Sequence, residues 1–147
     1  MKWKVLAIGK PSLAYARTGI VEYLSRLKHY APVDIQYLKD AGSIEGNAKR
    51  LREASEGCLR MVLDERGKSL TTSELVDWVK GQAMDGSVKQ VAVLIGGAEG
   101  HSEEMRQQAD ILLNLSKLTL QHELALLTFM EQLYRVHTVI RGEPYHR

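Results

Sequence analysis

Short runs of apolar residues alternate with longer stretches of helical periodicity along this chain. The run Val5–Ile8 is closed by Gly9-Lys10-Pro11, which is typical of a buried strand that meets a turn. Residues 12–29 then place apolar side chains at helical spacing, and Pro32 ends that segment. Val33–Leu38 alternates between apolar and polar positions, as a half-buried strand does. The chain is therefore predicted to begin with a strand, a helix and a second strand.

The next part of the chain is predicted to repeat this alternation. Lys39–Gly46 is polar and contains glycine, so it is predicted to be a loop, and a helix is expected from about Asn47 to Gly57. Leu59–Leu63 is predicted to be a third strand, with a helix that continues to Arg60 as the alternative. The polar segment Asp64–Lys68 is predicted to be a turn at the carboxyl end of that strand.

The second half shows the same two kinds of segment. A helix is predicted to start near Thr72, with Thr71 or Thr72 as its N-cap and Glu74 or Ser73 in its first turn. Gln90–Ile95 is a near-continuous apolar run, typical of a strand buried on both faces of a parallel sheet. The remaining predicted elements are a turn at Gly96–Gly100, a helix at His101–Ala109 capped by Ser102, a strand at Ile111–Leu115, a helix at about His122–Arg141 and a tail at Gly142–Arg147.

This alternation of strands and helices predicts an α/β fold, in which helices flank a mostly parallel sheet. No internal repeat or domain boundary is visible, so residues 1–147 are expected to form a single domain. The last predicted helix is apolar around most of its circumference, and a helix of that kind is buried on more than one side. A subunit interface is one explanation, and one face on the sheet with the rest under a loop is the other. The apolar residues are Leu124, Ala125, Leu126, Leu127, Phe129 and Met130.

Composition excludes several classes of protein. Apolar residues make up 44% and charged residues 26% of the 147 residues, which is ordinary for a globular protein. The lone cysteine, Cys58, excludes an internal disulfide framework and is consistent with a reducing cytoplasm. No stretch approaches the roughly 18 apolar residues of a membrane span. No CxxC or HExxH spacing occurs, so no metal site is expected.

The distribution of charge is more informative than the net charge of +2. From residue 61 onward, acidic residues outnumber basic ones by twelve to nine. The first 30 residues contain the single acid Glu22, against the bases Lys2, Lys4, Lys10, Arg17, Arg26 and Lys28. A basic N-terminal third is consistent with an RNA-facing surface, because cations that contact phosphates release counterions. A solvated helix face explains the same residues equally well.

Three loops compete for a ligand, because ligands of open α/β sheets bind outside the carboxyl ends of the strands. These loops are Leu63–Lys68, Ile95–Gly100 and Leu113–Leu120. The middle loop has a strand–GGxxG–helix form, in which glycines let backbone amides approach a ligand closely, although a tight turn without a ligand has the same residues. Ser102 is better explained as a helix cap than as a nucleophile, because no GxSxG motif surrounds it.

Several segments together resemble a known family. They are LDERGK at 63–68, IGGAEG at 95–100, LSKLTLQHEL at 115–124, EQLYR at 131–135 and GEPYHR at 142–147, with EYLSRL at 22–27 in the first predicted helix. In order and spacing they resemble the bacterial large-subunit ribosomal RNA pseudouridine-N3 methyltransferases of the SPOUT superfamily. The resemblance covers essentially the whole chain.

This resemblance implies a SPOUT fold with a C-terminal deep trefoil knot, a cytoplasmic homodimer formed largely through the last helix, and S-adenosylmethionine as cofactor. The substrate would be ribosomal RNA in the large subunit or the assembled ribosome. The cofactor would be held by the three loops named above, which correspond to the knot loops of the family. The residues carried over to cofactor binding are Leu63, Gly96, Gly97, Gly100, Leu115, Ser116, Lys117, Leu118, Thr119 and Leu120.

The implied reaction also needs groups that act on the base, and these could come from the opposite subunit. The enzyme must align N3 with the methyl group, accept the N3 proton and offset charge on the carbonyl oxygens of the base. His146 is the expected proton acceptor, with Glu131 as its rival. Tyr145 is expected to position the base, and Arg135 and Arg147 are expected to contact phosphate or carbonyl oxygens.

The chain departs from the family pattern at one position of interest. Leu126 stands four residues after His122, where relatives carry an arginine, and the residues on either side of His122 are Gln121 and Glu123 where many have a proline. The alternatives to an active enzyme are a knotted, catalytically inactive RNA- or ribosome-binding homologue and a flavodoxin-like nucleotide-binding module.

Overall fold

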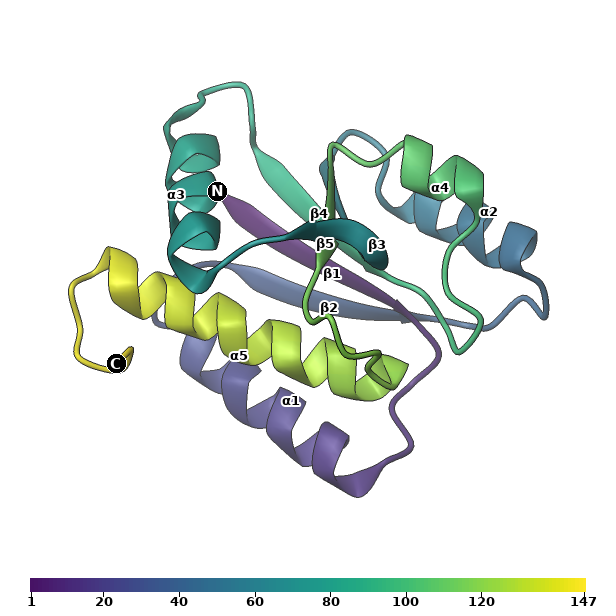
Figure 1. The fold of residues 1–147 in the computed structure, drawn as a ribbon, viewed down its shortest axis with the longest axis horizontal. Helices are drawn as coiled ribbons and strands as arrows, with labels where there is room; N and C mark the ends of the chain where they lie inside the picture. The colour runs from purple at the N-terminus through teal and green to yellow at the C-terminus, as the bar shows by residue number, and fades with distance from the viewer.

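The computed structural model describes residues 1–147 and consists of a five-stranded sheet with helices on both faces (Figure 1). The strands are β1 (Lys2–Ile8), β2 (Val33–Leu38), β3 (Leu59–Ser69), β4 (Gln90–Ile95) and β5 (Ile111–Asn114). The helices are α1 (Ala14–Leu27), α2 (Ile44–Ala54), α3 (Thr72–Met84), α4 (Glu103–Gln107) and α5 (His122–Ile140). Every strand pair is parallel, so the predicted α/β fold with a parallel sheet is confirmed.

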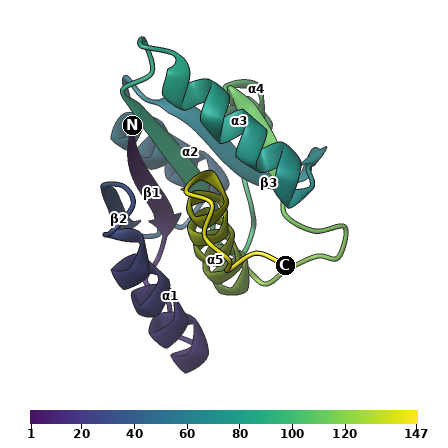
Figure 2. The ribbon, with the colours of Figure 1, turned by 90° about the vertical axis from the view of Figure 1, so that its left-hand side faces the viewer.

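The order of the strands explains where the helices lie. Across the sheet the order is β2-β1-β4-β3-β5. The connections through α1 and α3 lead in one direction across the sheet on one face, and those through α2 and α4 lead in the opposite direction on the other face (Figure 2). Reversing both the direction and the face leaves the handedness unchanged, so all four crossovers have the same hand, as parallel βαβ units do.

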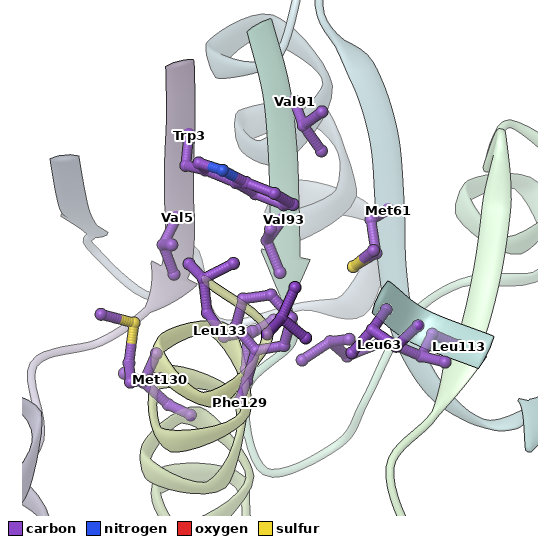
Figure 3. Close-up of a cluster of buried hydrophobic side chains, with 14 of the residues drawn as sticks. Trp3, Val5, Met61, Leu63, Val91, Val93, Leu113, Phe129, Met130 and Leu133 are labelled. Atoms are coloured by element: carbon purple, nitrogen blue, oxygen red, sulfur yellow. The ribbon is translucent and has the colours of Figure 1, made fainter. Parts of the chain in front are cut away.

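The main hydrophobic core lies on the face of the sheet that carries α1, α3 and α5. Phe129, Met130 and Leu133 of α5 are buried against strand residues such as Val5 and Val93 (Figure 3). Burial of each such side chain is worth about 1.5–3 kcal/mol. A smaller cluster on the other face packs α2 and α4 against the sheet. The larger core therefore depends on the last helix of the chain.

Helix α5 lies between α1 and α3, although the strand before it, β5, is at the outer edge of the sheet (Figure 2). Its contact with α1 is close, because a Cβ atom added to Gly19 would lie 2.5 Å from Cδ1 of Leu127. Contacts of α5 with the sheet, α1 and α3 in the same chain thus account for part of the burial that the sequence predicts for this helix. None of the helices combines the length and the apolar composition needed to cross a lipid bilayer.

Glu123, in the first turn of α5, joins this helix to the start of α1. The N-cap residue of α1 is Leu13, whose side chain cannot accept a hydrogen bond. The Glu123 carboxylate instead binds the residues just before the helix, accepting from the Ser12 amide at 2.7 Å, the Leu13 amide at 2.9 Å and the Ser12 hydroxyl at 3.0 Å. A side chain more than 100 residues away thus satisfies two amides at the start of α1.

Several predicted boundaries need correction. The helix expected from Asn47 begins three residues earlier, at Ile44, because Ser43 accepts a hydrogen bond from the Gly46 amide and caps it. The helix expected at His101–Ala109 is limited to α4, so His101 precedes the helix and Ser102 is its N-cap. By contrast, Leu59–Leu63 is a strand, as predicted, and Thr71 forms a capping box with Glu74.

Replacing Glu123 by alanine is expected to lower the free energy of unfolding by about 1–3 kcal/mol, because two amides lose their charged acceptor. Hydrogen bonds, led by that from the Leu13 amide, lower the pKa of Glu123 below its ordinary value of 4.5. The stabilisation is therefore fully present above pH 4.5 and is lost as the pH falls through the lowered pKa. Urea unfolding from pH 7 to pH 3 measures both effects. Glu56→Ala, at an exposed acid, is the control, and an equal loss in both variants would contradict the role of Glu123.

Candidate functional site

The three candidate loops lie side by side because their strands are neighbours. β4, β3 and β5 are adjacent and parallel, so their carboxyl ends meet at one edge of the sheet. The loops that follow them are the ones that the sequence predicts for a ligand. The structure therefore brings the predicted cofactor residues to a single edge of the sheet.

The first loop is a bulge within β3. Leu63 and Lys68 both pair with Leu113 of β5, so the four residues between them protrude from the ladder. The segment predicted as a turn therefore belongs to a longer strand with a break in its register. Gly67 lies so close to β5 that an added Cβ atom would be 2.5 Å from the carbonyl carbon of Leu112. Glycine is required here because the backbone of Leu112 in β5 occupies the position that a side chain would take.

The second loop is a tight glycine turn after β4. The Gly100 amide donates to the Gly97 carbonyl at 3.0 Å, and Gly100 has a φ of +77°, which favours glycine. A Cβ atom on Gly96, which is buried, would lie 2.9 Å from the backbone of Gly100. The turn itself thus accounts for these two glycines. Gly100 is the open position of the turn, because an added Cβ atom there meets nothing within 4 Å, whereas Gly97 lies against the Ile8 side chain.

The third loop, Leu115–Leu120, has many unpaired backbone groups. None of the 24 backbone–backbone hydrogen bonds outside helices and strands involves it. Only two of its amides are engaged by side chains, Ser116 by Asn114 at 3.2 Å and Leu118 by Ser116 at 3.0 Å. The Thr119 hydroxyl donates to Glu65 at 3.1 Å and joins this loop to the bulge of β3. Free amides and carbonyls beside that bulge suit a ligand that is recognised through backbone groups.

A second group of predicted residues forms a cluster where the C-terminal tail folds back on α5. Tyr145 donates to Glu131 at 2.7 Å, and Arg135 forms an ion pair with the same carboxylate at 2.7 Å. Arg135 also lies 3.1 Å from Nδ1 of His146, and its guanidinium lies over the ring of Tyr145 at 4.7 Å. Arg147 is exposed and makes no hydrogen bond. Four of the five predicted catalytic residues are thus in contact. We call Glu131, Arg135, Tyr145 and His146 the tail cluster.

Electrostatics in the tail cluster favour a neutral tyrosine and a fully engaged carboxylate. Burial, with hydrogen bonds to Tyr23 and Glu131, raises the pKa of Tyr145, so its hydroxyl remains a donor. Glu131 accepts from Tyr145, from Arg135 and from the side-chain amide of Gln132 at 2.9 Å. Because a guanidinium only donates, the Nδ1 atom of His146 must be the acceptor in its contact with Arg135.

The tyrosines that hold the tail were not predicted from the sequence. Tyr134 lies 4.7 Å from Tyr145 between ring centroids. Tyr30 donates to Glu143, and this hydrogen bond raises the pKa of Tyr30 to about 12. Its partner is 113 residues away, so no spacing in the sequence indicated this contact. Only the presence of Tyr23 and Tyr30 on and after the first predicted helix gave any signal.

The tail cluster and the three loops do not meet within one chain. A small hollow of about 10 Å³ at the start of α5 is lined by Gly9, Gly96 and Leu126, among others, and Leu126 is buried there. Arg135 is nine residues further along the helix, which corresponds to about 13 Å at the rise of an α-helix. None of the hydrogen bonds, ion pairs or aromatic contacts of residues 143–147 reaches the loops. The two groups of predicted site residues are therefore separate within one chain.

Comparisons with known proteins give this arrangement a context. Residues 1–146 match the family described as "Predicted SPOUT methyltransferase". The "Ribosomal RNA large subunit methyltransferase H" of Thermus thermophilus is 50% identical over 147 residues, covering 100% of this chain and 99% of that protein.

Solved structures share the fold at low sequence identity. A probable methylase family protein from Haemophilus influenzae Rd KW20 has a TM-score of 0.59 and 14% identity, with 99% of this chain and 70% of the other covered. The ribosomal RNA small subunit methyltransferase E from Neisseria gonorrhoeae, solved with S-adenosyl methionine, has a TM-score of 0.54 and 14% identity, with 92% and 66% covered.

The bulge of β3 yields a test that depends on the fold alone. Gly67→Ala is expected to lower the free energy of unfolding by about 1–3 kcal/mol, because the new Cβ atom forces the bulge away from β5. Gly86→Ala is the matched control, since an added Cβ atom there meets nothing within 4 Å. Chemical denaturation of both variants measures the difference. Equal stability of the two would show that the bulge is not packed tightly against Leu112.

Proposed function

The chain belongs to the SPOUT methyltransferase family, and we propose that it methylates N3 of a pseudouridine in ribosomal RNA of the large subunit. It is a methyltransferase whose cofactor is S-adenosylmethionine and whose substrate is ribosomal RNA. The observation that carries the proposal is the 50% identity to the Thermus large-subunit methyltransferase over the full length of both chains. The assignment of N3 of a pseudouridine as the methylated atom rests on the resemblance of the motifs from LDERGK to GEPYHR.

The three loops at the sheet edge fit the cofactor. Most backbone groups of Leu115–Leu120 are free to bind the adenine and ribose, and the backbone at Leu63, just before the bulge, is assigned to the same contact. Gly96, Gly97 and Gly100 form a tight turn without side chains of its own, and we assign its backbone to close contact with the cofactor. When bound, S-adenosylmethionine supplies an electrophilic methyl group on a positively charged sulfur. The residues Ser116, Lys117, Leu118, Thr119 and Leu120 complete the proposed binding loop.

The tail cluster supplies groups suited to the base. Arg135, held by Glu131, and Arg147 at the exposed end of the tail are assigned to phosphate or to the carbonyl oxygens beside N3, where negative charge develops as the proton leaves. Tyr145 presents a neutral hydroxyl and an aromatic ring, which can hydrogen-bond to and stack on a base. Because the base and the cofactor are then held together in one complex, the attack of N3 on the methyl group no longer requires a separate encounter.

His146 is the better proton acceptor of the two candidates. Glu131 already receives hydrogen bonds from three side chains and holds Arg135 and Tyr145 in place, so it acts as the support of the cluster. His146 is exposed, near the end of the tail, and has a single contact, with Arg135. A small movement of the tail frees its Nδ1 atom to take the N3 proton.

A second copy of the chain is proposed to complete the site. The loops and the tail cluster are separate in one chain, so a homodimer that places the tail of one subunit beside the loops of the other joins them. Helix α1, which packs on α5, exposes Tyr15 and Val21 to 53% and 66%, and these residues provide an apolar surface for such contact. The dimer would use α1 and α5, as the apolar pattern of the last helix suggests.

We also propose that the single domain of residues 1–147 contains the trefoil knot of the family. Helix α5 lies between α1 and α3, whereas β5 lies beyond β3. The chain must therefore pass the connection between β3 and α3 on its way to α5, and passing through it rather than around it forms the knot.

A site shared between two subunits suits a large composite substrate such as the assembled ribosome, and a ribosomal substrate implies a cytoplasmic enzyme.

The direct test is incubation of the purified protein with tritiated S-adenosylmethionine and ribosomes from cells that lack their own enzyme. Mass mapping should then locate the label on N3 of a large-subunit pseudouridine. Binding of the cofactor without any label would identify a catalytically inactive homologue, and label at another nucleotide would contradict the pseudouridine assignment.

Replacing His146 by alanine is expected to reduce the single-turnover rate by about 10²–10⁴-fold, the usual contribution of a general base. The dissociation constant for S-adenosylmethionine should stay unchanged, because the loops hold the cofactor through backbone groups, whereas His146 acts on the base. His29→Ala, at another exposed histidine, is the control. If His146→Ala keeps the full rate while Glu131→Gln loses it without loss of stability, the proton acceptor is Glu131.

A further inference from the structure

Three side chains beside the loops have no part in the chemistry described above. Asp64 opens the bulge of β3, His101 directly follows the glycine turn after β4, and Arg106 is in α4. The two charged side chains are mostly buried, with exposed fractions of 8% for Asp64 and 14% for Arg106. Buried charged groups at a ligand-binding edge need an explanation, since removing them from water is costly.

Arg106 connects the two loops directly. Its Nη1 atom donates to the carbonyl oxygen of His101 at 2.9 Å and lies 3.4 Å from the Asp64 carboxylate. The other nitrogens of the guanidinium donate to Glu103 at 2.8 and 3.1 Å, which fixes its orientation. One planar group therefore holds the backbone after the glycine turn and the first residue of the bulge at the same time.

The environment of His101 supports the same junction. The residue is 8% exposed, and its Nε2 atom has no hydrogen-bond partner. Its ring lies beside the backbone of Leu63, just before the bulge of β3, and of Leu94, near the end of β4, and close to Asp64 and Arg106. Burial lowers the pKa of His101, so the imidazole is neutral at neutral pH and does not compete with Arg106 for the Asp64 carboxylate. The ring thus fills the space between Leu63 of β3 and Leu94 of β4.

From these contacts we propose that Arg106 is a positioning residue that clamps the bulge of β3 to the glycine turn of β4 in the arrangement that binds S-adenosylmethionine. We call Asp64, His101 and Arg106 the Arg106 clamp. The inference rests on the proposed function, because it assigns the clamp to the cofactor loops of that same site. The clamp itself touches neither cofactor nor RNA.

The clamp complements a second link between loops. Thr119 and Glu65 connect the loop after β5 to the same bulge, at 3.1 Å. The bulge is therefore tied to both of its neighbours, through Asp64 on one side and Glu65 on the other. A cofactor held by backbone groups depends on the relative position of the loops, because backbone amides cannot adjust by rotating a side chain. Loss of either link would cost affinity by allowing the loops to separate.

The experiment measures cofactor affinity and loop opening in the full-length protein. Isothermal titration calorimetry gives the dissociation constant for S-adenosylmethionine, and hydrogen exchange gives the opening of residues 64–67 and 96–101 without cofactor. Arg106→Gln should raise the dissociation constant by about tenfold, the effect of losing hydrogen bonds to a charged group. It should also speed exchange in both loops while leaving β1 protected. Arg106→Lys keeps the charge but cannot reach both acceptors, so its effect should be intermediate.

The matched control is Arg52→Gln. Arg52 of α2 forms an ion pair at 3.2 Å with Glu104 of α4, the helix that also carries Arg106, but it contacts neither loop. Its replacement should leave the dissociation constant and the loop exchange at the values of the wild-type protein. The inference is overturned if Arg106→Gln binds the cofactor within twofold of wild type, if exchange rises equally in β1, or if Arg52→Gln has the same effect. A wild-type protein that binds no cofactor would overturn the proposed function, and the exchange rates would still show whether Arg106 holds the loops together.

Discussion

The packing of α5 between α1 and α3 is the constraint on which the other parts of the molecule depend. Phe129, Met130 and Leu133 fill the larger core, and Glu123 ties the start of the helix to α1. Because β5 lies at the outer edge of the sheet, a helix in this position requires the chain to cross from that edge to the centre. The crossing segment is the loop Leu115–Leu120, and it is thereby placed beside the ends of β3 and β4. The same packing step thus completes the core and the ligand-binding edge.

Local patterns in the sequence were sufficient for most of the fold. The apolar run Gln90–Ile95 matches β4 residue for residue, Ser102 is the N-cap that was predicted, and Thr71 is one of the two N-cap candidates for α3. The start of α2 was placed too late although its cap, Ser43, is local, and the error at β3 arose because the boundary depends on tertiary contacts. The bulge of β3 is strand-like only because Lys68 pairs with β5, and a polar segment with glycine gives no sign of that pairing. The position of α5 and the strand order likewise depend on packing between distant segments.

The candidate site was predicted unevenly. The three loops could be selected from strand ends alone, because adjacent parallel strands bring their carboxyl ends together. The membership of the tail cluster came from resemblance to a family, and the structure shows why the residues alone were insufficient. Glu131 and Arg135 form an ordinary helical pair, and only the folding back of the tail brings Tyr145 to the same carboxylate. Arg106 was not predicted because an arginine beside acids in a short helix has no distinctive pattern.

The place of α5 in the chain has a consequence for protein synthesis. The helix spans His122–Ile140, so it leaves the ribosome after all five strands and the other four helices. Until it arrives, the sheet face that includes Trp3, Val5 and Val93 has no cover between α1 and α3. Apolar surface exposed in this way promotes association with other chains. The nascent protein must therefore remain partly folded until α5 docks, and molecular chaperones can bind the uncovered sheet face during that time.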